Sequence, residues 1–228
     1  MFYRWAGLAI VAIAAPAPAA ATNPSADDLL LVAAYSTPDK ATALARIDRA
    51  LKLAEAELAR NPRNKEARLH RALAISYRGK LARSRADLLA SRREFEAIVA
   101  ADPQNAEAQL ALAGWHLAAV TAIGPMMARS MLGARTSVGL QALDRAVALG
   151  GDRALFPAFA GITRIQLDPD QIAVARKLVE AALRAGVPTP VDKVMQRQAA
   201  ALLKKLREGN GAAAAKEAKL LVPFGRVR

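Results

Sequence analysis

Few residues in this 228-residue sequence could perform chemistry, and their types exclude many enzyme classes. The chain has no cysteine and two histidines, His70 and His116, which rules out thiol nucleophiles, cysteine-ligated zinc, iron–sulfur clusters and three-histidine metal sites. His116 could serve as a general base for Ser130 or Ser137, but neither serine stands in a nucleophile-elbow motif. We therefore predict a protein that is not an enzyme and that uses no cofactor and no metal.

The segment from residue 114 to residue 139 is the most distinctive candidate for a binding site. Four glycines and a Gly-Pro break interrupt it, and it holds three methionines, whose flexible side chains suit adaptable apolar surfaces. A recess here would take an apolar or anionic ligand, whereas the alternative is core packing around a hydrogen-bonded histidine. The candidate lining residues are Trp115, His116, Met126, Met127, Arg129, Met131 and Arg135.

Basic charge is concentrated at two ends of the sequence. The chain carries 33 Lys+Arg against 20 Asp+Glu, a net charge of +13, and the surplus lies in residues 40–100 and 176–228 around a nearly neutral middle. Such regions could contact an acidic protein partner or an anionic membrane surface. Nucleic acid is disfavoured as a partner, because aromatic residues are only 4% of the chain and do not alternate with the basic residues.

Residues 1–21 have the composition of a signal peptide. Arg4 precedes an apolar run, and two prolines and small residues then lead to Ala19-Ala20-Ala21, which predicts cleavage after Ala21. The alternative, an uncleaved anchor, is disfavoured because the run is too short to span a bilayer. With no cysteine for a lipid anchor, we expect a periplasmic or secreted protein with no transmembrane helix in its mature form. The apolar stretch 108–128 is interpreted as a helix buried in a helical stack.

Alanine content and helix-boundary signals predict an all-α fold. Alanine accounts for 56 residues, and Pro, Asn and Gly mark helix boundaries at short intervals. We expect helices over 38–60, 64–79, 80–101, 168–186 and 189–209, with Asp168 as an N-cap and Gly79 in a turn. Short connections make successive helices antiparallel hairpins. The basic, Ala-rich tail, residues 210–228, could dock as a further helix or be disordered.

Two segments of the sequence align without a gap. Residues 61–80 and 102–121 match at Pro62 with Pro103, Asn64 with Asn105, and Glu66-Ala67 with Glu107-Ala108. Both resemble the first helix of a tetratricopeptide repeat, and residues 139–152 resemble a second helix. The proline spacing departs from the family's 34-residue period. The resemblance implies a short α-solenoid of stacked helical hairpins over residues 22–209, divergent from a regular array.

Helical-repeat proteins bind partners on the face that their stacking leaves free. The resemblance therefore implies a non-enzymatic scaffold or adaptor that binds a protein or peptide, and Arg68, Arg71 and Gln109 are its candidate contact residues. The alternative is a small-ligand or lipid-binding protein whose pocket is formed by residues 114–139.

Overall fold

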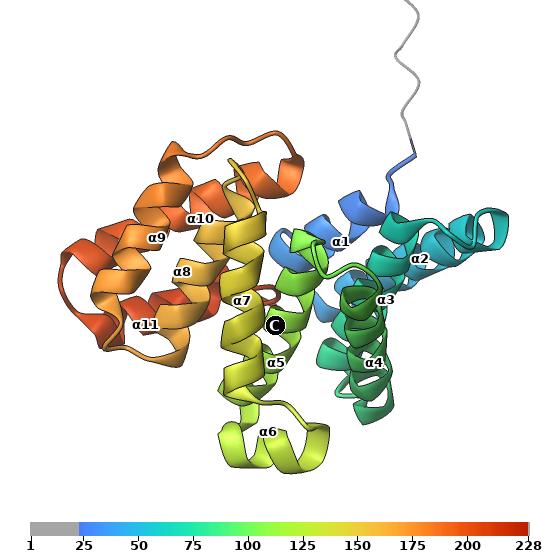
Figure 1. Cartoon of the computed structure of the whole chain (residues 1–228), viewed down its shortest axis with the longest axis horizontal. Helices are drawn as coiled ribbons and strands as arrows, with labels where there is room; N and C mark the ends of the chain where they lie inside the picture. Colours follow the sequence, from blue (N-terminus) through green and yellow to red (C-terminus); the bar gives the residue numbers. More distant parts are fainter. Residues whose placement is uncertain (1–22, 228) are drawn as a thin grey trace, which may run out of the picture.

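The computed structural model describes residues 23–227, and within that range every regular element is an α-helix, so the all-α prediction is confirmed (Figure 1). The predicted leader, residues 1–21, lies outside the described residues. The helices are α1 (Ala26–Tyr35), α2 (Lys40–Arg60), α3 (Lys65–Ala82), α4 (Arg85–Ala101), α5 (Ala106–Ile123), α6 (Pro125–Leu132), α7 (Thr136–Leu149), α8 (Leu155–Leu167), α9 (Ile172–Arg184), α10 (Pro190–Arg207) and α11 (Gly211–Leu221).

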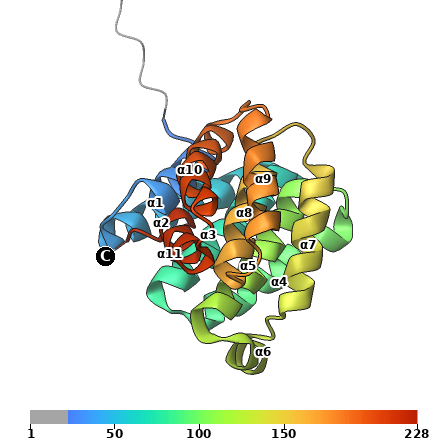
Figure 2. The same cartoon turned by 90° about the vertical axis from the view of Figure 1, so that its left-hand side faces the viewer.

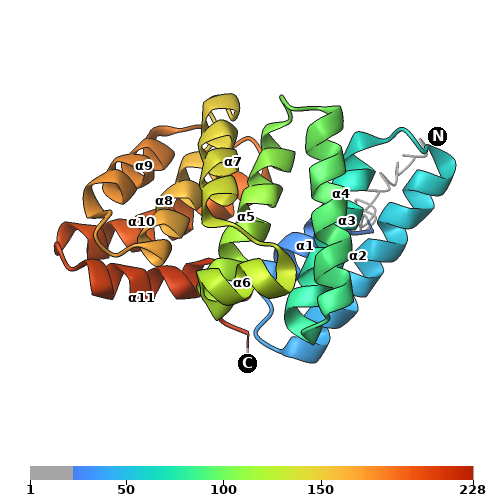
Figure 3. The same cartoon turned by 60° about the horizontal axis from the view of Figure 1, so that its bottom comes forward.

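Most consecutive helices pack against each other, as their short connections require. Helices α1 to α4 form one side of the molecule, α8 to α11 form the other, and α5 and α7 lie between them (Figures 1 and 3). Helix α6 departs from this pattern of consecutive hairpins. It crosses the end of α5, and the main neighbour of α5 is α7, the next helix but one.

The junctions at residues 61–65 and 102–106 are built alike, in keeping with their aligned sequences. In each, the carbonyl of the residue before proline accepts the amide of an asparagine three residues on, at 3.0 and 3.1 Å. The side chains of Asn64 and Asn105 then cap α3 and α5 by accepting an amide of the first turn, at 3.0 and 2.9 Å. The same local sequence therefore starts both helices in the same way.

The junction at residues 168–171 has a similar turn but a different helix start. The Asp168 carbonyl accepts the Gln171 amide at 3.2 Å, and α9 begins at Ile172 without a side-chain cap. The prediction of Asp168 as an N-cap is therefore wrong. Its carboxylate accepts the Asp170 amide at 3.0 Å within the turn, while its backbone ends α8.

Gly79 does not make a turn, which corrects the expected boundary between α3 and α4. Helix α3 continues to Ala82, Arg83 adopts a left-handed conformation (φ 57°), and Ser84 caps α4. A Cβ at position 79 would lie 3.0 Å from both Asp87 Cβ and the Leu88 backbone nitrogen. Glycine at this position therefore allows the two helices to approach closely.

Alanine and leucine dominate the buried residues, and α5 and α8 have the most buried residues of the described helices, with nine and eight. Small side chains let neighbouring helices approach closely, which accounts for much of the alanine excess. Across residues 23–227 no single helix has the length and apolar character needed to cross a membrane. Helices α5 and α6 meet that length and composition only as a pair bent by 119°.

Residues 210–227 fold back onto the rest of the molecule. Helix α11 packs against α8 and α10, and the segment 222–227 reaches the first helix, where the Phe224 amide donates to the Ala34 carbonyl at 2.8 Å. The Lys80 Nζ donates to the Pro223 carbonyl at 2.8 Å. Figure 2 shows the end of the chain beside α1. The sequence left open whether this tail docks as a helix or is disordered, and in the structure α11 is a docked helix.

Candidate functional site

Trp115 and His116 lie inside the molecule and connect α5 to its neighbours. The Trp115 Nε1 donates to the Leu88 carbonyl of α4 at 3.0 Å, and the Arg135 amide donates to His116 Nδ1 at 3.1 Å. The two rings meet edge to face, with 5.1 Å between centroids. Trp115 therefore holds the start of α4 against α5, and His116 holds the segment before α7.

The environment of His116 favours its neutral form. Burial lowers its pKa to about 4, the positive charges of Arg92 and Arg135 act in the same direction, and Glu96 opposes them. The side chain is 1% exposed, and its Nε2 is buried without a partner among the described residues. Since Nδ1 accepts a backbone amide, we infer that the proton of the neutral ring lies on Nε2.

The methionines and arginines predicted with that pair lie on the surface. Met126, Met127 and Met131 of α6 are exposed, as are Arg129 and Arg135. An open depression of about 740 Å³ lies between α6 and the start of α7, lined by Met126, Arg129, Arg135 and neighbouring residues. The seven candidate residues are therefore divided between a buried pair and an exposed surface.

The three residues predicted for a partner-binding face have different environments. Arg68 is exposed on α3, whereas Arg71 forms ion pairs with Glu94 of α4 and with Glu55 of α2, the latter at 3.7 Å. Gln109 is buried, and its Nε2 donates to the Pro103 carbonyl at 3.1 Å. Arg71 connects α3 to α2 and α4, and Gln109 supports the turn before α5. Of the three residues predicted for the partner-binding face, Arg68 is the exposed one.

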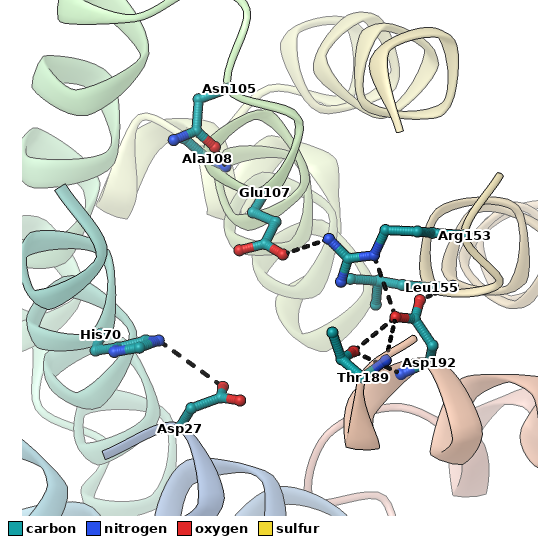
Figure 4. A network of polar contacts seen from close by, with 9 residues as sticks. All are labelled: Asp27, His70, Asn105, Glu107, Ala108, Arg153, Leu155, Thr189 and Asp192. Atoms are coloured by element: carbon teal, nitrogen blue, oxygen red, sulfur yellow. Dashed lines mark hydrogen bonds and ion pairs between the residues drawn. The ribbon is translucent and has the colours of Figure 1, made fainter. Parts of the chain in front are cut away.

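A second group of polar residues, which sequence reasoning did not single out, meets where α1, α3, α5 and α10 come together (Figure 4). His70 Nε2 of α3 lies 3.9 Å from the Asp27 carboxylate of α1. Glu107 of α5 accepts from Arg153 Nη1 at 2.7 Å, and Arg153 Nε donates to Asp192 at 3.1 Å. Residues from distant parts of the sequence thus form two neighbouring polar groups, and the charge of Glu107 acts on Asp27 across the space between them.

Asp192 anchors this region from inside the protein. Its carboxylate is fully buried and accepts the Leu155 amide at 3.0 Å, together with the amide and hydroxyl of Thr189. Thr189 and Asp192 form the capping box of α10. The Thr189-Pro190-x-Asp192 pattern is the sequence signal that could have identified this residue.

Asp27, Glu66 and Glu107 occupy the same position in three helices, the second residue of α1, α3 and α5. We call these three residues the acidic row. Burial raises the pKa of Asp27, the nearby carboxylates Glu107 and Glu66 raise it further, and His70 opposes them. The alignment of Glu66 with Glu107 is the sequence signal for two of the three positions.

Within residues 23–227, no group of three His, Asp or Glu side chains is placed to hold a metal ion. Comparisons with protein families, with curated proteins and with solved structures found no match to this chain.

Proposed function

We propose that this chain is a non-enzymatic scaffold, similar to tetratricopeptide-repeat proteins, that binds a basic protein or peptide segment at the acidic row. The observation that carries the proposal is the placement of the acidic row, because Asp27, Glu66 and Glu107 each stand at the second residue of a helix, with Glu66 and Glu107 exposed and Asp27 partly exposed. Burial is the main cause of the raised pKa of Asp27, and repulsion from Glu107 and Glu66 adds to it. A lysine or arginine side chain of a partner would relieve that repulsion. Because about half of the Asp27 side chain is exposed, a partner could reach it.

The contacts around Glu107 support the same region. Arg153 holds one oxygen of Glu107, and its own position is fixed by the buried Asp192. The face is thus attached to the starts of α8 and α10, which gives it the rigidity that a binding site needs. An acidic partner at Arg68 and Arg71 is less well supported, because Arg71 already pairs with two glutamates of its own chain.

Peptide selection tests the proposal. A random peptide library displayed on phage is selected on the whole chain, and enriched peptides are synthesised and titrated by fluorescence anisotropy. We expect enrichment of Lys and Arg, and about tenfold weaker binding, or about 1.4 kcal/mol, when the acidic row is neutralised. The test variant carries Asp27→Asn, Glu66→Gln and Glu107→Gln.

The matched control, with Asp48→Asn, Asp170→Asn and Glu217→Gln, removes the same charge from α2, a turn and α11. Equal weakening in both variants, or selection of acidic peptides, would contradict the proposal. The substitution at position 27 should not unfold the chain. Because a raised folded-state pKa means that folding disfavours the ionised carboxyl, a neutral asparagine removes that cost at neutral pH.

We also propose that the mature protein is periplasmic or secreted and begins at Thr22. The support is the sequence of residues 1–21. Mass spectrometry of protein recovered from outside the cytoplasm should give an N-terminal peptide starting at Thr22, and recovery of intact Met1 would contradict export.

The proposal of a non-enzymatic role is supported by the position of His116. The imidazole is buried and holds the Arg135 amide, so its geometry is that of a packing residue. Gly114 precedes and Leu117 follows the Trp115-His116 pair along α5, and neither has a polar side chain.

A further inference from the structure

Exposed apolar side chains are concentrated where α5 bends into α6. Ile123, Met126, Met127 and Met131 are four of the eight large apolar side chains that residues 23–227 expose. Met126 is 83% exposed, more than any other in that range. A concentration of this kind on one short element needs an explanation, whereas single exposed apolar residues do not. We call these four residues the α6 patch.

The charges that α6 and its flanking segments carry all have one sign, and the nearby Glu96 of α4 is paired with Arg92. The sequence contains no Asp or Glu between Glu107 and Asp144. Arg129 and Arg135 are exposed on either side of the depression, and neither pairs with a carboxylate of residues 23–227. From α4, Arg85 donates to the Met131 carbonyl at 3.0 Å and places one more cation at the end of α6. The patch therefore combines apolar side chains with a positive rim.

The direction of α6 suits contact with a flat surface. The chain turns by 119° between α5 and α6, and α6 lies crosswise at the lower edge of the molecule in Figure 1 and at the same edge in Figure 2. A surface beneath α6 would meet the helix along its length, with α5 and α7 rising from it. This is the arrangement of an amphipathic helix that lies in a membrane interface.

The depression beside α6 offers donors of the kind that bind a phosphodiester. Ser130, Thr136 and Ser137 line it together with Arg129 and Arg135. Helix α7 begins there without a side-chain cap, so its first amides have no side-chain acceptor among the described residues. These donors lie next to Met126, as a lipid headgroup lies next to its acyl chains.

We propose that α6 docks this protein onto an anionic lipid surface, with the α6 patch inserted below the headgroups and Arg129 and Arg135 binding lipid phosphates. A lipid surface accounts for both features together, because it supplies an apolar layer and a dense layer of negative charge. Glu107 stands at the first turn of α5 and α6 follows its last turn, so about 27 Å separates them and the acidic row stays accessible. The docking proposal does not depend on the proposed partner.

Vesicle binding tests the inference. The purified chain is sedimented with sucrose-loaded vesicles of equal parts phosphatidylcholine and phosphatidylglycerol, and with vesicles of phosphatidylcholine alone. We expect binding to the anionic vesicles and about tenfold weaker partitioning when Met126→Ser and Met127→Ser remove the apolar contact. The matched control, Val174→Ser with Leu220→Ser, changes two apolar residues of α9 and α11 that are each 45% exposed.

A second pair of variants separates local charge from net charge. Arg129→Gln with Arg135→Gln should weaken binding to anionic vesicles about tenfold, while Arg176→Gln with Arg197→Gln, which removes equal charge from α9 and α10, should weaken it much less. Equal losses in the two variants would mean general attraction of a basic protein and would overturn the proposal. Absence of binding to the anionic vesicles would overturn it as well, and would leave a protein partner as the occupant of the patch.

Insertion can be measured directly because the native sequence has no cysteine. An environment-sensitive dye attached through Met127→Cys should shift to the blue on anionic vesicles, while the dye attached through Leu220→Cys should not. Similar spectra at the two positions would contradict insertion of α6.

Discussion

The Nε of Arg153 lies 3.1 Å from the carboxylate of Asp192, which is completely buried, and the same guanidinium reaches Glu107 at 2.7 Å. One arginine therefore connects α5, the start of α8 and the start of α10. Asp192 also accepts the Leu155 amide, so its carboxylate satisfies donors from two helix starts. This carboxylate therefore helps to join α8 and α10 to the central helix α5.

Replacing Asp192 should be among the costliest single changes in the protein. In Asp192→Ala, the Arg153 guanidinium and the Leu155 amide lose a buried acceptor, and we expect a loss of about 3 kcal/mol in the free energy of unfolding, measured by urea denaturation. Glu208→Ala is the control, because it breaks only the exposed ion pair with Lys205 and should cost less than about 1 kcal/mol. Similar midpoints for the two variants would contradict this account.

His116 should make the protein sensitive to mild acid. Its pKa in the folded chain is about 4, below the ordinary 6.5, so the unfolded chain binds more protons between these values. The stability due to neutral His116 is complete above about pH 6.5 and is lost as the pH falls through about 4, by roughly 3 kcal/mol at most.

Urea denaturation between pH 7 and pH 4 measures this effect. His116→Asn keeps an acceptor for the Arg135 amide but does not titrate, so its stability should fall less with pH than that of the native chain. Parallel curves for the native chain and His116→Asn would show that the ring is not responsible.

Gly79→Ala should destabilise the protein although alanine favours helices. The new Cβ would meet Asp87 Cβ and the Leu88 backbone at 3.0 Å, so α3 and α4 must move apart, at a cost of about 1 to 3 kcal/mol. In Gly114→Ala the nearest atom is the end of the Phe159 ring at 3.2 Å, and this partly exposed side chain can shift by the few tenths of an ångström needed. The helix propensity gained, about 1 kcal/mol, should then leave stability nearly unchanged. Thermal melts of both variants provide the comparison.

Phe224 should contribute to stability well beyond its local turn. Its ring is 8% exposed and meets Tyr77 edge to face, with 4.9 Å between centroids. Phe224→Ala should cost about 3 kcal/mol in urea denaturation, whereas Leu220→Ala, at an exposed position, should change stability by about 0.5 kcal/mol or less. Equal stability of Phe224→Ala and the native chain would mean that this contact does not hold the tail in solution.

Local signals predicted the helices well because their causes are local. Asn64 and Asn105 cap the helices that their spacing indicated, and Thr189-Pro190 starts α10. Gly79 misled the prediction because glycine serves both turns and close helix contacts, and only the position of α4 distinguishes the two uses.

The polar sites were harder to predict because they depend on contacts between distant residues. Nothing near Asp27 in the sequence indicates that Glu66 and Glu107 will lie close to it. The sequence also predicted one site for Trp115, His116 and the methionines of α6, and the structure divides these residues for a related reason. The bend at Gly124 directs α6 across the end of α5, so the methionines face outward while the two rings stay inside.

The hydrogen bond between Lys80 and Pro223 joins residues 143 positions apart, and it changes how the helical array should unfold. In an open array the outermost hairpins fray independently, because each contacts only its neighbour. Here segment 222–227 covers α1 and α3, so loosening one end releases the other, and hydrogen exchange in α1 should be coupled to that in α11. During synthesis, α1 and α3 must also wait until this segment has left the ribosome before their packing is complete.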